Sequence, residues 1–79
     1  MQIIKEIPHQ ACRITLFYWN NKYLIKIEQG NLEQTYKIEE SNIMKESDLD
    51  KMLQNGLLNK TLERFYHMQK DLSESLFDL

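Results

Sequence analysis

The chain has 79 residues, of which 42% are hydrophobic and 28% are charged, and its formal net charge is −2. This composition is typical of a globular domain, and one cysteine without a Cys/His cluster excludes an internal disulfide and a structural zinc site. The acidic balance argues against duplex nucleic-acid binding, which requires a basic excess. Because no apolar stretch approaches the ~20 residues of a membrane span and no secretory signal is visible, we expect a cytoplasmic domain without a membrane partner.

The N-terminal half alternates between apolar and polar residues, as β-strands do. Residues 2–7 are expected to form a short strand, and the segment after it is a connection because Pro8 lacks a backbone donor. Three further strands are expected over 12–19, 22–29 and 32–39.

The strands are separated by two dipeptides that are typical of tight hairpin turns. Asn20-Asn21 indicates a type I′ turn and Gly30-Asn31 a type II′ turn, since these residues tolerate the positive φ that such turns require. Residues 1–39 are therefore predicted to form an antiparallel meander of three to four strands.

Two-residue turns fix the register, so the residues on each face of the sheet can be assigned. The first turn pairs Phe17 with Leu24 and Trp19 with Lys22. One face is apolar and is the expected core, with Ile14, Leu16, Tyr18, Tyr23, Ile25, Ile27, Leu32, Tyr36 and Ile38. The other, outer face carries Arg13, Thr15, Lys22, Lys26, Glu28, Glu33, Thr35 and Lys37, with Phe17, Trp19 and Leu24 among them.

The C-terminal half, residues 48–79, is predicted to be helical, after a linker over 40–47 that breaks the strand period. Ser47 and Asp50 form a capping-box pattern that begins a short helix over about 48–54. Asn55-Gly56 is a typical signal for the end of that helix.

A long helix is expected from Leu57 onward, because neither Gly nor Pro interrupts this segment. One stripe of residues recurs at steps of four and three and is apolar except at Gln69: Leu58, Leu62, Phe65, Gln69, Leu72 and Leu76. The same spacing is typical of a coiled-coil seam. Packing on the sheet is favoured because nothing else is available to cover its apolar face.

The predicted fold is therefore a single α+β domain over residues 1–79. An antiparallel meander carries a short helix and a long C-terminal helix, and the long helix packs on one face of the sheet. The stretch ITLFYWNNKYLIKIEQGNLEQTYKI, followed by these helices, resembles small uncharacterised bacterial proteins with a β-meander and C-terminal helices. The resemblance rests on the hairpin spacing and on the EQG-LEQTYK stretch, and it implies a fold without an activity.

One candidate for chemistry lies on the polar side of the long helix, where Glu63, His67 and Asp71 recur every four residues. A histidine with a carboxylate one turn away on each side is a pattern that binds a divalent ion or transfers a proton. The neighbouring Lys60 and Arg64 favour an ordinary solvated helix face with ion pairs. Because the sequence has neither a nucleophile elbow nor a phosphate loop, we expect neither an enzyme nor a cofactor.

The outer sheet face is the stronger candidate. Phe17, Trp19 and Leu24 form an apolar centre beside Lys22 and Lys37, which is the anatomy of a protein-binding surface. The alternatives are coverage by the linker or the N-terminal strand, and simple exposure. Single-stranded nucleic acid also binds such faces, but the glutamates on this face disfavour it. We therefore predict a module that binds itself or another protein through these five residues.

Overall fold

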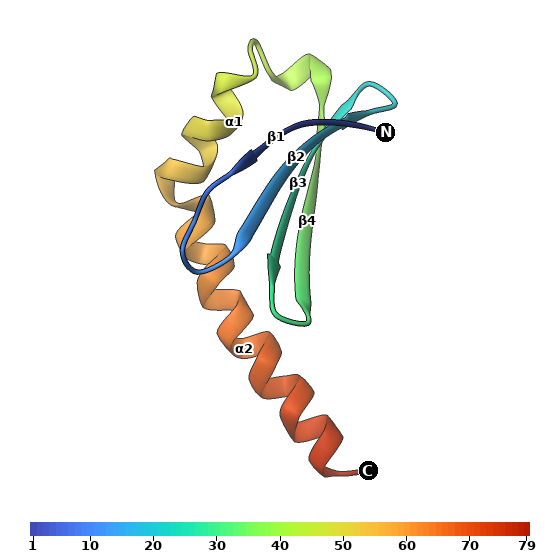
Figure 1. The fold of residues 1–79 in the computed structure, drawn as a ribbon, viewed down its shortest axis with the longest axis vertical. Helices are drawn as coiled ribbons and strands as arrows, with labels where there is room; N and C mark the ends of the chain where they lie inside the picture. The colour runs from blue at the N-terminus through green and yellow to red at the C-terminus, as the bar shows by residue number, and fades with distance from the viewer.

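The computed structural model describes all residues from Met1 to Leu79. Four strands form one antiparallel sheet in chain order: β1 (Gln2–Ile7), β2 (Arg13–Trp19), β3 (Lys22–Gln29) and β4 (Leu32–Glu39) (Figure 1). A 3-10 turn, η1 (Glu40–Asn42), leads towards helix α1 (Ser47–Met52). A kinked segment, η2 (Leu53–Leu57), whose backbone is non-helical at Asn55 and Gly56, joins α1 to the long helix α2 (Leu58–Phe77). The α+β fold with a β-meander and a C-terminal helix is thereby confirmed.

Both hairpin turns have the backbone conformation that the sequence predicts. Asn20 and Asn21 have φ values of 54° and 61°, as a type I′ turn requires, and Gly30 has a φ of 58°. The register follows from these turns, because a two-residue loop leaves no freedom to slip. Phe17 accordingly faces Leu24, and the other residue pairs predicted between β2 and β3 and between β3 and β4 are also present.

The first strand joins the sheet at the edge beside β2, and a β-bulge interrupts its pairing. Ile3 pairs with Phe17, whereas Lys5 pairs with Leu16, so one residue between them is extra. The bulge therefore places Ile3 on the outer face and Lys5 on the core side. There the Lys5 ammonium lies 2.8 Å from Oδ2 of Asp50 in α1.

The start of α1 differs from the predicted capping box. Neither Ser47 nor the N-cap residue makes a side-chain capping bond; instead Oδ2 of Asp48 accepts the backbone N–H groups of Met44 and Lys45 at 3.2 Å. Asp50, the other half of the predicted box, is drawn away by its ion pair with Lys5. Asp48, the residue after Ser47, thus holds the segment that leads into α1 through these two hydrogen bonds.

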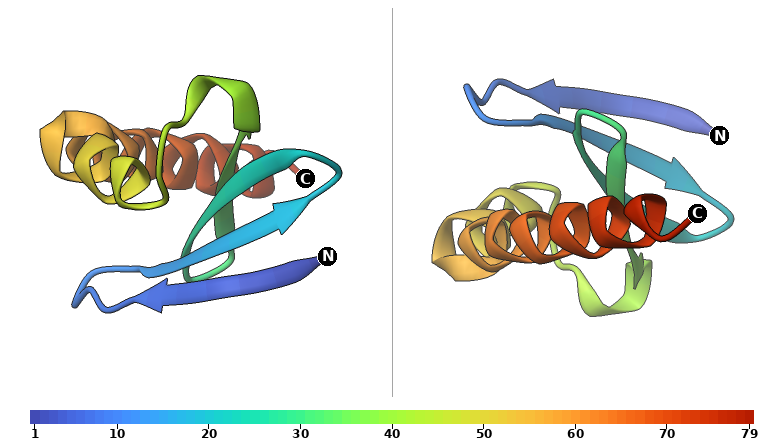
Figure 2. Two further views of the ribbon diagram at one scale, coloured as in Figure 1. Left: turned by 90° about the horizontal axis from the view of Figure 1, so that it is seen from above. Right: turned by 90° about the horizontal axis from the view of Figure 1, so that it is seen from below.

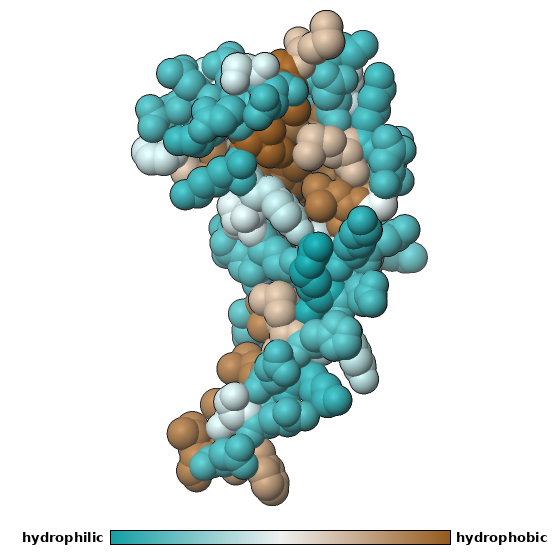
Figure 3. Space-filling model, turned by 180° about the vertical axis from the view of Figure 1, so that it is seen from behind, coloured by the Kyte–Doolittle hydropathy of each residue, from teal (hydrophilic) through white to brown (hydrophobic).

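The two helices lie on one side of the twisted sheet, and α2 extends past its end (Figures 1 and 2). Gly56 has a φ of 115° and turns the chain between α1 and α2 without an intervening loop. The molecule measures 46 × 24 × 19 Å, and apolar side chains remain visible along its narrow lower part (Figure 3). The prediction that α2 packs on the sheet therefore describes its first half only.

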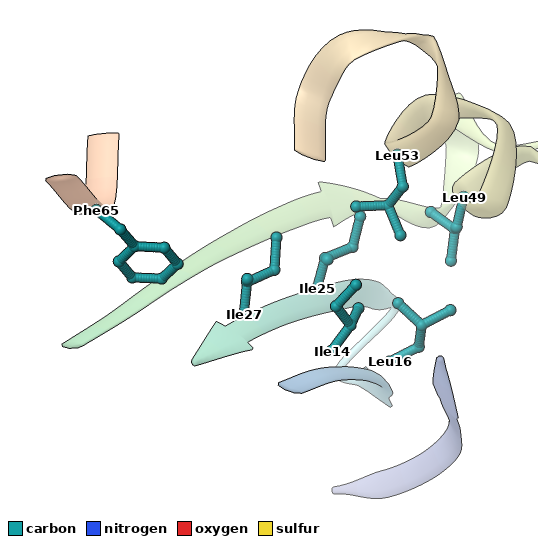
Figure 4. Close-up of a cluster of buried hydrophobic side chains, with 7 residues drawn as sticks. All are labelled: Ile14, Leu16, Ile25, Ile27, Leu49, Leu53 and Phe65. Carbon is teal, nitrogen blue, oxygen red and sulfur yellow. The ribbon is translucent and has the colours of Figure 1, made fainter. Parts of the chain in front are cut away.

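The core is a single layer of side chains between the sheet and the helices (Figure 4). The sheet contributes four of these residues and the helical part contributes three: Ile14, Leu16, Ile25, Ile27, Leu49, Leu53 and Phe65. All four sheet residues belong to the face that the register assigns to the core. Each fully buried side chain of this kind contributes about 1.5–3 kcal/mol relative to exposure.

Polar contacts fix the first half of α2 against β4. Thr61 is fully buried, and its hydroxyl donates to the carbonyl oxygen of Leu57 at 2.9 Å. The Gln34 amide donates to the Thr61 carbonyl oxygen at 2.9 Å, and the Tyr36 hydroxyl lies 3.3 Å from the Thr61 hydroxyl. Arg64 donates to the Tyr36 hydroxyl at 2.7 Å. These bonds satisfy the buried polar atoms and set the direction in which α2 leaves the sheet.

We predict that Phe65→Ala destabilises the fold by about 3–5 kcal/mol, because it removes the one buried aromatic side chain that α2 places in the core. Since the chain is small, this loss is comparable with its entire stability, so Phe65→Leu provides a milder variant with a loss of roughly 1–2 kcal/mol. Urea unfolding followed by circular dichroism measures both. Glu63→Ala, an exposed change on the same helix, is the control and should stay within about 0.5 kcal/mol of wild type. Equal midpoints for Phe65→Ala and the control would contradict this description of the core.

Candidate functional site

The predicted binding residues lie together on the outer face of the sheet. One row of cross-strand partners runs across all four strands, from Ile3 through Phe17 and Leu24 to Lys37. Trp19 and Lys22 form the next cross-strand pair along the sheet. Neighbours in such rows have Cβ atoms only about 4.5–5.5 Å apart, so these six side chains form one surface, which we call the outer-face patch.

No second layer covers the outer-face patch. Both helices lie against the opposite face of the sheet, and β1 adds to the sheet edge instead of folding over it (Figure 2). The question that the sequence left open, whether the N-terminal strand or the linker buries this face, is therefore answered: neither does.

The apolar members of the patch differ in exposure. Leu24 is only 6% exposed. Phe17 is half-buried, Trp19 is 46% exposed and Ile3 is 64% exposed. Leu24 is thus the floor of the patch, and a partner would touch mainly Trp19, Ile3 and the edge of Phe17.

The contribution of Ile3 is missing from the sequence-based prediction. Simple alternation along residues 2–7 does not reveal which residues share a face, because the bulge after Ile3 shifts the pairing by one residue. The only sequence signal for Ile3 is the β-branched pair Ile3-Ile4 in a short strand. That signal does not say which of the two side chains points outward.

The charges beside the patch are of two kinds. The ammonium nitrogen of Lys26 lies 3.9 Å from a carboxylate oxygen of Glu28 and from one of Glu33, so the sheet itself compensates its charge. Lys22 and Lys37 form no ion pair with any carboxylate of the chain. The apolar centre therefore has two cations at its edge that remain free to meet an anionic group.

Two grooves lie along β1, and the second of them reaches Ile3 of the outer-face patch. The first, of about 480 Å³, lies between the end of β1 and the α1–η2 segment and contains the ion pair of Lys5 and Asp50. Oδ1 of Asp50 is buried without a hydrogen-bond partner. His9 also lines this groove, but its Nδ1 accepts the backbone N–H of Ala11 at 3.0 Å. No serine, threonine or cysteine lines this groove.

The second groove, of about 560 Å³, is lined by the phenols of Tyr18 and Tyr23 and by Glu40 and Glu46. The Tyr18 hydroxyl donates to Oε2 of Glu40 at 2.7 Å, and the two tyrosine rings meet edge to face at 5.4 Å. The hydrogen bond to Glu40 raises the pKa of Tyr18, because it stabilises the protonated phenol beside an anion. A phenol with a raised pKa is a poorer proton donor and a poorer nucleophile near neutral pH, which argues against catalysis here.

The remaining candidates for chemistry also lack the necessary surroundings. Cys12 is half-buried, and burial raises the pKa of its thiol, which lowers the thiolate fraction near neutral pH. Glu63, His67 and Asp71 stay on the exposed side of α2, and no three His, Cys, Asp or Glu side chains come together as a metal site. The His67 ring instead packs edge to face against Tyr66 at 5.4 Å.

Comparison with protein-family models, with curated proteins and with solved structures finds no match to this chain. No helix combines the length and the apolar character needed to cross a lipid bilayer. The case for a function therefore rests on the surfaces that the chain itself presents.

We predict a pH dependence from the bond between Tyr18 and Glu40. Because the pKa of Tyr18 is raised above its ordinary value of 10.0, this bond stabilises the fold fully below that pH. The stabilisation is lost as the pH rises through the raised pKa. Titration of the phenolate absorbance should show a step above the ordinary tyrosine range that disappears in Tyr18→Phe. Tyr66→Phe, which alters an exposed phenol, should keep the step; its loss in that variant instead would contradict the assignment.

Proposed function

We propose that the protein is a small binding module whose outer-face patch docks on another protein. The observation that carries this proposal is a contiguous apolar group on a sheet face without a covering layer. Scattered exposed apolar residues are ordinary, but here Ile3, Phe17 and Trp19 are neighbours on two adjacent strands. Tryptophan is the residue type most enriched among those that dominate binding energy, and this chain has only one.

The charges indicate the chemistry of the partner. Lys22 and Lys37 flank the apolar centre without a carboxylate partner, so a docking surface with apolar residues and carboxylates at its edge would match both features. Exposed rim charges of this kind act more on the association rate than on the final affinity. The proposed partner is therefore an apolar, acidic surface or segment of a different protein.

Single-stranded nucleic acid fits this face less well. Glu39 is the cross-strand neighbour of Lys22, and Glu28 and Glu33 already compensate Lys26. The only cations of this face outside an ion pair are Lys22 and Lys37, whereas proteins that bind single strands track the phosphates with a continuous positive groove. The charge pattern thus favours a protein partner.

We predict that Trp19→Ala weakens partner binding by more than tenfold while the circular dichroism spectrum stays that of wild type. Proteins retained by the immobilised wild-type chain would be identified by mass spectrometry, and their affinities for each variant would then be measured by titration calorimetry. Thr35→Ala, on the same face but outside the patch, is the matched control and should bind like wild type. Lys22→Glu should slow association, and raising the salt concentration should reduce this difference.

The single tryptophan also reports on the patch directly. Acrylamide should quench Trp19 fluorescence readily in the free protein and less readily once a partner covers the patch. If Trp19→Ala unfolds the chain, Trp19 serves the core and the proposal is wrong. Equal affinity of Trp19→Ala and Thr35→Ala for every retained protein would also overturn it.

A further inference from the structure

A second surface of the chain is also left without a partner. Met68 is the last residue of α2 that packs against the core and is partly buried, and the apolar stripe beyond it becomes progressively more exposed. Leu72 is 39% exposed and Leu76 58% exposed, and apolar side chains run along the narrow part of the molecule in Figure 3. We call residues 66–77 the projecting half of α2. After Met68, no residue of this half belongs to the core or packs against it, so its apolar surface stays in contact with water unless a partner covers it.

The distribution of charge around the projecting half is one-sided. With 100° between successive residues, one continuous strip around Leu72 contains no charged side chain: Met68, Gln69, Leu72, Ser75 and Leu76. The charged residues of α2 and its C-terminal end in this region lie on the flanks of the helix or on the side opposite the strip: Lys70, Asp71, Glu74 and Asp78. A strip without charges fits another uncharged helix face better than it fits a charged groove.

The polar members of this side of the helix already have partners within it. The Gln69 amide donates to the Ser73 hydroxyl at 3.1 Å, and the Ser75 hydroxyl donates to the Asp71 carbonyl oxygen at 2.9 Å. Burying a polar group is costly mainly when it is left without a hydrogen bond. These two internal bonds therefore lower the cost of removing the strip from water.

We propose that the projecting half of α2 pairs with that of a second copy of this chain, antiparallel, on a two-fold axis at Leu72. The strip is self-complementary about this residue. Leu72 would meet its own equivalent, and Met68 would meet the partner's Leu76, as an isologous contact requires. The pairing uses a different surface from the outer-face patch, so it stands or falls separately from the proposed function.

The antiparallel direction follows from electrostatics. A parallel pair would align the two helix dipoles and place Glu74 and Asp78 of both copies at the same end of the dimer. Antiparallel pairing opposes the two dipoles and carries these acidic residues to opposite ends of the contact, whereas Asp71, next to the two-fold axis, stays close to its equivalent. The same acidic residues disfavour an anionic lipid surface as the occupant, because only Lys70 opposes them.

The proposed contact is small. The strip has five side chains in each copy, whereas a standard protein interface has about 20–30 residues a side, so this pairing belongs to the small, transient class. The dimer is therefore expected to be weak and reversible. It should be visible in a concentration series and absent at high dilution.

Sedimentation equilibrium of the full chain tests the pairing, with two neighbouring variants as a matched pair. Leu76→Glu places a charge in the strip and should raise the dissociation constant more than tenfold. Phe77→Glu makes the same kind of change at a 90% exposed residue on the back of the helix and should leave dimerisation within a few-fold of wild type. A wild-type chain that stays monomeric at millimolar concentration, or equal effects of the two variants, would overturn the proposal. Loss of the dimer in Trp19→Ala would also overturn it and would assign the contact to the sheet.

Cysteine cross-linking tests the direction of the helices in a Cys12→Ala background, which removes the native thiol. Oxidised glutathione should convert Leu72→Cys to a disulfide-linked dimer, because identical residues meet only on the two-fold axis. Leu76→Cys should stay largely monomeric, whereas a mixture of Met68→Cys and Leu76→Cys should cross-link between the two kinds of chain. Glu74→Cys, on the opposite side of the helix, is the control. Efficient self-linking of Leu76→Cys would indicate parallel helices and would overturn the antiparallel arrangement.

Discussion

One layer of seven buried side chains, between a single sheet and the helices, holds this molecule together. A chain of this size buries only about 60% of the surface that its unfolded form exposes, so the layer has little stability to spare. A strand or helix packs against the rest of the molecule only where its side chains reach this layer. Large apolar side chains fail to reach it on the outer face of the sheet and along the end of α2, and Met44 before α1 is a single further case. Both proposed contacts lie there because the core is thin and one-sided.

The fold was largely predictable because local backbone chemistry sets the register of the meander. Asn20, Asn21 and Gly30 supply the positive φ values of two tight turns, and each turn leaves one possible pairing of the flanking strands. Once Phe17 faces Leu24, alternation places every neighbouring side chain on a known face. The core residues of the sheet and most of the outer-face patch follow from these few positions.

The features that escaped prediction depend on contacts between segments distant in sequence. The bulge that turns Ile3 outward exists only because β1 pairs with β2, and Lys5 draws Asp50 away from the predicted capping box. The point at which α2 loses contact with the sheet depends on the relative lengths of the two elements. A 20-residue helix is about 30 Å long, and the spacing of its apolar stripe is the same where it is covered and where it is bare.

The length of the projecting half would set the distance between the two outer-face patches of the proposed dimer, and this distance affects how tightly the dimer binds a target with several docking segments. If the helices cross at Leu72 as proposed, the two Phe65 anchors would lie about 20 Å apart, and two sheets would be carried at opposite ends of one short rod. Such a particle would be bivalent, with a spacing set by the helical rise and not by a flexible linker. A target that repeats its docking segment at matching intervals would gain avidity, because the second engagement becomes intramolecular. A target with a single segment, or with the wrong spacing, would gain none.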